Sequence, residues 1–145
     1  MTRRADDTGP VTEVDPFDLP EWLGEQDVTW RAGSGLRTGH RVTGRLEGPG
    51  EQDHHPCDLL AVDEAYPLPV LDDQTRSRAH LAWRHGQVLL LATEGSPLTL
   101  AVPGTAFDAD LALDALSRLA KAVGASPEHY AVLLRIGHDA GPGRG

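Results

Sequence analysis

The stretch DADLALDALSRLAKAVG at residues 108–124 decides much of the fold, because it has the features of an amphipathic helix. Acidic residues occupy its first turn, Arg118 and Lys121 lie near its end, and Gly124 is suited to end it. Its apolar residues recur at helical spacing and predict one buried stripe. That stripe consists of Ala112, Leu116, Leu119, Ala120 and Val123.

The residues before this helix predict two strands and a second helix. Residues 87–92 are apolar on both faces, as in a central strand, and a turn leads into a partner strand over residues 98–102. Further upstream, Asp72 is suited to cap a helix that runs to about His85 and is closed by Gly86. The middle of the chain therefore predicts helices packed on a sheet.

Further strands are predicted on either side of this region. Residues 28–46 form two alternating runs around a glycine-containing loop, which indicates a hairpin with one buried face. Residues 57–63 have an apolar centre and predict a more interior strand. Residues 126–136 could begin a helix, yet the alternation over residues 130–136 favours a short turn followed by a strand.

Together these elements predict an α+β fold in the order β-β-β-α-β-β-α-β, with one mainly antiparallel sheet and two main helices packed on it. A short helical turn is expected at the N-terminal end, where Asp18 and Glu21 have the spacing of a capping box. The length of 145 residues suits a single domain, which we place at residues 16–136. Residues 1–15 and 137–145 show neither period and are predicted to be disordered tails.

The net charge of −9 and the single cysteine limit the classes of partner and compartment. A strongly acidic chain is repelled by nucleic acid and by anionic membranes, so we expect neither as a partner. Cys57 alone cannot form an intramolecular disulfide, and the sequence contains no targeting or membrane-spanning stretch. These observations favour the cytoplasm.

The best metal candidate is the set His54, His55 and Cys57, since imidazole and thiolate suit zinc. Adjacent histidines seldom converge on one ion, and no second pair lies at finger-like spacing, so we expect no metal or other cofactor. The same residues offer a local nucleophile and base, but neighbours at the start of a strand need not face each other. We therefore assign no catalytic residue and interpret the segment as a loop beside a buried thiol.

Charge is segregated along the chain, and this is the pattern that most suggests a site. Residues 28–46 hold four arginines and no acid, whereas residues 46–75 hold eight acids and no lysine or arginine. On the predicted hairpin Arg31, Arg41 and Arg45 would project from one face and could bind an anionic partner. The alternative is that this face lies in water or pairs with acidic segments of the same chain.

A second candidate binding segment contains Phe17 and Trp22 among acidic residues. The simpler interpretation is a clasp packed on the domain, because tryptophan is usually buried at least in part. The alternative is an exposed peptide that docks into a groove of a partner.

The segments DPFDLPEWLG (residues 15–24) and LAVPGTAF (residues 100–107) are similar to those of small uncharacterised proteins of high-GC actinobacteria. The resemblance would cover most of residues 16–136, and it implies no activity and no site residues. The predicted order of elements also resembles the arrangement in type III secretion chaperones, a likeness of fold that carries no function.

The sequence shows no group of reactive side chains at a spacing that would bring them together in one site. The sequence therefore favours a protein-interaction or adaptor module, with a protein partner or self-association, over an enzyme. The alternative is a small-ligand-binding protein or an enzyme whose site is assembled from dispersed residues, such as Cys57, a histidine and an arginine.

Overall fold

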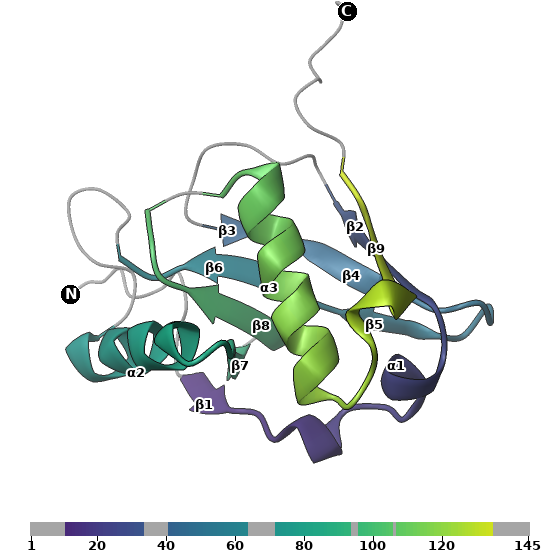
Figure 1. Cartoon of the computed structure of the whole chain (residues 1–145), viewed down its shortest axis with the longest axis horizontal. Coiled ribbons are helices and arrows are strands. Elements are labelled where there is room, and N and C mark those ends of the chain that lie inside the picture. The colour runs from purple at the N-terminus through teal and green to yellow at the C-terminus, as the bar shows by residue number, and fades with distance from the viewer. Residues whose placement is uncertain (1–10, 34–40, 64–71, 94–95, 106, 135–145) are drawn as a thin grey trace, which may run out of the picture.

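The computed structural model of the chain describes residues 11–33, 41–63, 72–93, 96–105 and 107–134. Within them the strands are β1 (Val11–Glu13), β2 (Val28–Ala32), β3 (Arg41–Val42), β4 (Gly44–Glu47), β5 (His54–Pro56), β6 (Asp58–Ala61), β7 (Leu89–Thr93), β8 (Ser96–Val102) and β9 (Tyr130–Leu133). The helices are α1 (Trp22–Glu25), α2 (Asp73–Arg84) and α3 (Ala109–Ala122), with 3₁₀ turns η2 (Pro16–Asp18) and η3 (Pro127–His129). The predicted α+β class with two main helices is confirmed (Figure 1).

Both main helices begin and end where the sequence predicts. Asp72 caps α2 and Asp108 caps α3, each accepting a hydrogen bond from an amide of the first turn, at 2.7 and 2.8 Å. Gly86 and Gly124 follow the two helices with φ of 79° and 86°. Glycine adopts this left-handed conformation without strain, which is why the helices stop there.

One sheet has five strands in the order β1-β7-β8-β6-β3, and only β6 and β8 run parallel. All four side chains of β6 are buried, as is every described side chain of β8. Their alternate residues belong to two clusters, one on each face. Leu59 and Leu100 pack in the cluster that contains α3 residues, whereas Leu60 and Ala101 pack in the cluster that contains Ala79 of α2. The five-stranded sheet is therefore covered on both faces.

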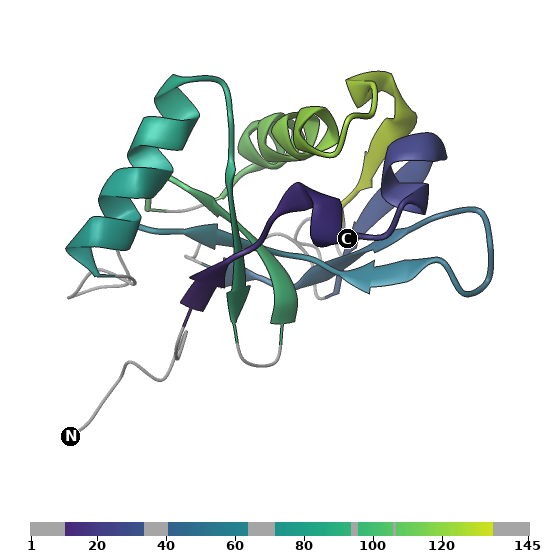
Figure 2. The same cartoon turned by 90° about the horizontal axis from the view of Figure 1, so that it is seen from below.

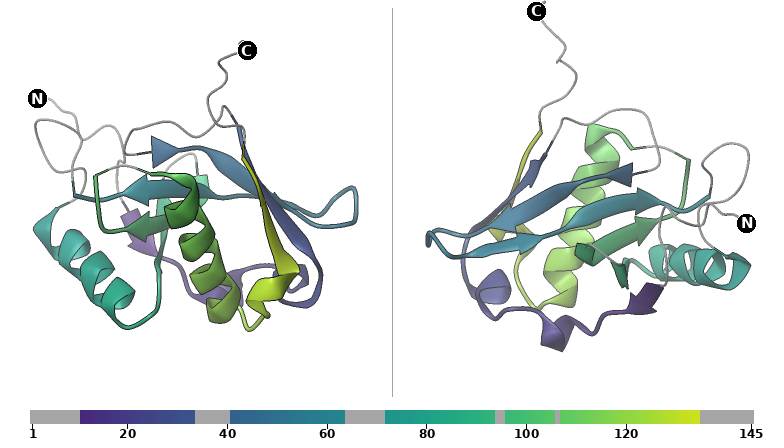
Figure 3. Two further views of the ribbon diagram at one scale, coloured as in Figure 1. Left: turned by 45° about the horizontal axis from the view of Figure 1, so that its top comes forward. Right: turned by 180° about the vertical axis from the view of Figure 1, so that it is seen from behind.

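The second sheet has four strands in the order β5-β4-β2-β9, and only β2 and β9 run parallel. Val28, Trp30 and Leu46 on its inner face are buried in the main core, whereas Arg31 and Arg45 on its outer face are exposed. This alternation is the one predicted for the hairpin. Seen from behind, β4 and β5 lie in front of α3 and no helix of the described ranges lies over them (Figure 3, right).

The prediction of a single sheet in the order β-β-β-α-β-β-α-β is wrong. Additional strands are β1 and β5, the latter in the segment interpreted as a loop, and two paired segments pass from one sheet into the other. β3 and β6 pair in the five-stranded sheet, and their neighbours along the chain, β4 and β5, pair in the four-stranded sheet. The Trp30 indole contacts both segments where they cross. Its N–H donates to the Cys57 carbonyl at 2.9 Å, and a Cβ on Gly44 would lie 2.5 Å from its ring. The segments bend around this indole and divide the predicted sheet in two.

Helix α3 lies across the strands, and α2 lies at the end of the molecule opposite β2 and β9 (Figure 1). In the view turned by 90°, α3 forms a layer above the strands (Figure 2). The main core is enclosed between α3 and the inner faces of both sheets. No helix in the described part of the chain is long and apolar enough to cross a membrane.

The two ends of the described chain contribute strands. Residues 11–15, which the sequence places in a disordered tail, include β1, which pairs antiparallel with β7, and the Val14 amide donates to the Leu90 carbonyl at 2.9 Å. A strand of three residues is too short for a period of two to show in the sequence. β9 is a strand after a short turn, as the alternation of the sequence predicts. The rest of both predicted tails, residues 1–10 and 137–145, lies outside the described residues.

The short N-terminal helical turn is present as two pieces, η2 and α1. Asp18 caps neither piece, so the predicted capping box is wrong: α1 begins after Glu21 without a side-chain cap and includes Gly24. η2 is capped by Asp15, whose Oδ1 accepts a hydrogen bond from the Phe17 amide at 3.0 Å. Asp18 is itself the last residue of η2, which Pro16 begins because its fixed φ favours the first position of a turn.

Candidate functional site

The outer face of the four-stranded sheet presents two rows of side chains. Leu133, Arg31, Arg45 and Pro56 lie side by side across β9, β2, β4 and β5. A parallel row has Ala131, Thr29, Glu47 and His54 on the same four strands. We call the eight residues of these rows the arginine face.

Glu47 binds both arginines of the arginine face. Arg31 Nε donates to Glu47 Oε1 at 3.4 Å, and Arg45 Nε donates to Glu47 Oε2 at 2.5 Å. Burial by itself would raise the pKa of Glu47, but the hydrogen bonds and positive charges of Arg45 and Arg31 outweigh it and lower that pKa below its usual value. One ionised carboxylate thus lies between two guanidinium groups. The local excess is one positive charge, on a chain with a net charge of −9.

The two arginines keep donors that a partner could use. They lie directly opposite each other on β2 and β4, an arrangement of like charges that destabilises a sheet. The side chains of Arg31 and Arg45 remain 44% and 54% exposed. Within the described ranges neither guanidinium has an acceptor other than Glu47. Because a guanidinium carries several N–H donors in a planar fork, each can still bind a second carboxylate.

Arg41, the third arginine predicted for this face, is held in the other sheet. Its Nη2 donates to Asp58 Oδ2 at 2.9 Å, and Asp58 Oδ1 accepts a hydrogen bond from the Gly44 amide at 3.3 Å. The Asp58 side chain is only 8% exposed, so Arg41 neutralises a carboxylate that is largely removed from water. The structure therefore places Arg41 apart from Arg31 and Arg45, in a pair within the chain.

The three metal candidates are not brought together. His54 is exposed on the arginine face, whereas His55, the next residue of β5, is half-buried, and desolvation lowers the pKa of its imidazole. Cys57 is fully buried, and desolvation together with the nearby charge of Asp58 raises the pKa of its thiol well above the usual value. A buried thiol with a raised pKa is a poor metal ligand and a poor nucleophile. No group of three His, Cys, Asp or Glu side chains among the described residues could hold a metal ion.

Phe17 and Trp22 have different surroundings. Trp22 is half-buried against the main core, and its ring is so close to Gly48 that a Cβ there would lie 2.9 Å away. Phe17, in contrast, is 94% exposed on η2. Trp22 thus acts as the clasp that fixes the segment on the domain, while Phe17 faces solvent.

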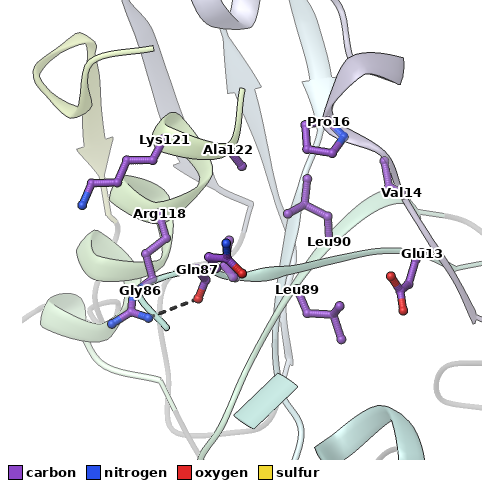
Figure 4. Close-up of a pocket in the computed structure, with 11 residues that line it drawn as sticks. Glu13, Val14, Pro16, Gly86, Gln87, Leu89, Leu90, Arg118, Lys121 and Ala122 are labelled. Carbon is purple, nitrogen blue, oxygen red and sulfur yellow. Dashed lines mark hydrogen bonds between the residues drawn. The ribbon is translucent and has the colours of Figure 1, made fainter. Parts of the chain in front are cut away.

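A groove of about 520 Å³, lined in part by Pro16, was not foreseen from the sequence. It opens between α3, the connection from α2 to β7, and the N-terminal segment (Figure 4). We call it the α3 groove. Its apolar lining includes Val14, Pro16, Leu90 and Ala122, and its charged lining residues are Glu13, Arg118 and Lys121. Its walls come from three segments that are distant along the chain, so no local pattern could have predicted it.

Arg118 fixes one wall of the α3 groove. Its guanidinium stacks on the Trp83 ring at 3.5 Å and donates to the carbonyls of Trp83 and Gln87 at 2.6 and 3.1 Å. It also donates to Asp114, one turn earlier on α3. Arg118 therefore ties α3 to the connection between α2 and β7 along this wall.

Sequence reasoning also missed a polar cluster beneath α2. Asp63 accepts a hydrogen bond from the Gly104 amide at 2.9 Å, and its other oxygen lies 2.8 Å from His80 Nε2 and 3.8 Å from Arg76 Nε. A histidine oriented by an aspartate is part of a catalytic triad, but no hydroxyl or thiol of the described chain is hydrogen-bonded to His80. We interpret the cluster as an anchor between α2 and the end of β6.

Comparison with protein-family models, with curated proteins and with solved structures gives no match. The resemblance to actinobacterial proteins therefore stays a prediction.

Proposed function

We propose that the protein is an interaction module whose arginine face binds an acidic segment of a partner protein. The observation that carries the proposal is the row Leu133, Arg31, Arg45 and Pro56 on a sheet face over which no described helix lies. The two exposed guanidinium groups lie opposite each other there and share a single carboxylate. Like charges opposed in this way weaken a sheet. Binding a second carboxylate would relieve that repulsion.

The charge distribution favours a short acidic segment over a nucleic acid. A duplex would extend well beyond two arginines and would meet the acidic surface of a chain with a net charge of −9. A short segment can place its carboxylates on Arg31 and Arg45 and an apolar side chain on Leu133, which is 42% exposed. Complementary charge of this kind contributes specificity and speeds association.

Fluorescence anisotropy of labelled hexaglutamate tests the proposal. We expect weak binding at low salt that disappears as salt screens the charges. The double variant Arg31→Ala/Arg45→Ala removes two exposed ion pairs with the peptide, each contributing up to about 1 kcal/mol, and should raise the dissociation constant on the order of tenfold. Arg78→Ala/Arg84→Ala removes the same charge from exposed positions of α2 and serves as the matched control. Equal weakening in both double variants, or no binding to the wild type at low salt, would contradict the proposal.

A further inference from the structure

We propose that the chain forms a two-fold symmetric homodimer in which Phe17 of each copy inserts into the α3 groove of the other. The proposal concerns a different surface from the arginine face, so each can fail without the other. It rests on the position of Phe17, on the shape and charge of the groove, and on the short distance along the chain between the two.

Phe17 is presented on an ordered turn. Its amide donates to Asp15 Oδ1 at 3.0 Å, the Asp18 amide donates to the Asp15 carbonyl at 2.8 Å, and the Leu19 amide donates to the Pro16 carbonyl at 3.1 Å. A ring that is 94% exposed gains nothing from this order within its own chain. Held on a turn that is already formed, it loses little further conformational entropy when it docks.

The α3 groove suits such a ring. Val14, Pro16 and Leu90 form an apolar part of its lining, beside the polar side chains of Glu13 and Gln87 (Figure 4). A volume of about 520 Å³ exceeds what a benzyl group needs, and falls within the range of small-ligand pockets. Aromatic side chains that fill apolar pockets are the usual anchors of protein interfaces.

The charge next to the ring is opposite to the one free cation that the described part of the groove offers. Phe17 is flanked by the exposed Asp15 and Asp18, whereas the exposed Lys121 lies on the α3 side of the groove. The other charged lining residues are paired within the chain, Arg118 with Asp114 and Glu13 with Arg78. Lys121 is exposed and is the only lysine of the sequence. Docking of the acidic turn on this side of the groove would bring opposite charges together, although the chain as a whole carries a net charge of −9.

A second copy is the occupant because the anchor and the groove are neighbours. Pro16 lines the groove and Phe17 is the next residue, so one small patch carries both halves of the contact. In a two-fold dimer the same patch of each copy faces the other, and residue i contacts residue j while j contacts i. A two-fold axis beside Pro16 therefore makes both insertions at once.

Sedimentation equilibrium of the full chain tests the dimer. We expect a monomer–dimer equilibrium in the wild type, and Phe17→Ala should raise the dissociation constant on the order of a hundredfold, since two rings are lost per dimer. Leu81→Ala and Leu113→Ala, which truncate side chains that are 52% and 49% exposed on α2 and α3, should leave the equilibrium unchanged. Arg31→Ala/Arg45→Ala should also dimerise normally, which separates this result from the arginine-face proposal.

Mixing two variants tests the reciprocal geometry. Ala122→Trp fills the groove but keeps Phe17, whereas Phe17→Ala keeps the groove but lacks the ring. Each should be monomeric alone, and their mixture should associate more tightly than either because one of the two insertions is intact. Circular dichroism confirms that each variant is folded. A wild type that stays monomeric, a dimer that Phe17→Ala leaves unchanged, or a mixture without any gain overturns the proposal.

Discussion

The two sheets of this protein differ in how many of their faces are covered, and the difference can be seen in one strand of each. β6 has four consecutive buried residues, because α3 and α2 belong to the clusters on its two faces. β2 alternates between buried and less buried residues, because only its inner face belongs to the core. Continuous apolar sequence thus indicates a strand covered on both sides, and alternating sequence indicates one with an open side. The open side is where a partner can bind.

The largest effect is expected at Trp30, on the inner face of the four-stranded sheet. Trp30→Ala removes a fully buried indole and its hydrogen bond to Cys57 at the bend between the sheets, and should destabilise the protein by about 3–5 kcal/mol in urea unfolding. Arg31→Ala, one residue further on the outer face, should stay within about 0.5 kcal/mol of the wild type. Comparable losses at both positions would mean that the outer face is not open.

Alanine substitutions at two neighbouring residues of β6 should both be costly, unlike the pair in β2. Leu59→Ala and Leu60→Ala truncate neighbouring side chains on opposite faces, and both side chains are fully buried. Each variant should lose about 2–5 kcal/mol of unfolding free energy, measured by urea denaturation. If Leu60→Ala were nearly neutral, the second face of this sheet would not be packed as described.

The helix that covers this second face depends on its cap. Asp72→Ala removes the acceptor for the Thr75 amide and should cost about 1 kcal/mol at neutral pH, whereas Asp72→Asn retains an acceptor and should cost less. The hydrogen bond from the Thr75 amide lowers the pKa of Asp72. Its stabilisation is therefore present above the usual value of 3.8 and is lost as the pH falls through the lowered pKa. Thermal unfolding at neutral and acid pH measures both effects, and a penalty independent of pH would contradict the ionised cap.

The smallest effect is expected at Glu47 on the open face. Glu47→Gln leaves Arg31 and Arg45 opposed without a carboxylate between them, and should cost about 0.2–1 kcal/mol at neutral pH because the pairs are partly exposed. The pKa of Glu47 is lowered, so the difference from the wild type should persist down to pH 4.5 and vanish as the pH falls through the lowered pKa. Urea unfolding across this acid range measures the difference. A penalty that grows toward acid pH would contradict the assigned network.

The elements with local signals were predictable from the sequence. The helices over residues 73–84 and 109–122 carry their own caps, and the alternation of residues 28–32 assigned the two faces of β2 correctly. The division into two sheets depends on a contact between Trp30 and Gly44, which are distant along the chain. A glycine inside a strand pattern is the one available signal of such a close approach.

The strand period of two residues predicted one part of the candidate site. That period placed Arg31 and Arg45 together, since both lie on the exposed side of their strands. It could not show that Arg41 meets Asp58, because that depends on how residues 41–47 register against residues 54–60. The α3 groove depends on tertiary packing throughout, and no local rule identifies it.

The central claim is that the open face of the four-stranded sheet is the binding surface for an acidic segment. Nuclear magnetic resonance titration of the labelled protein with hexaglutamate tests it most directly. We predict that the amides of residues 29–31, 45–47 and 131–133 shift together and stop shifting in Arg31→Ala/Arg45→Ala. Shifts confined to α2, where Arg84 is exposed and Arg76 and Arg78 are paired with carboxylates of the chain, would contradict the account.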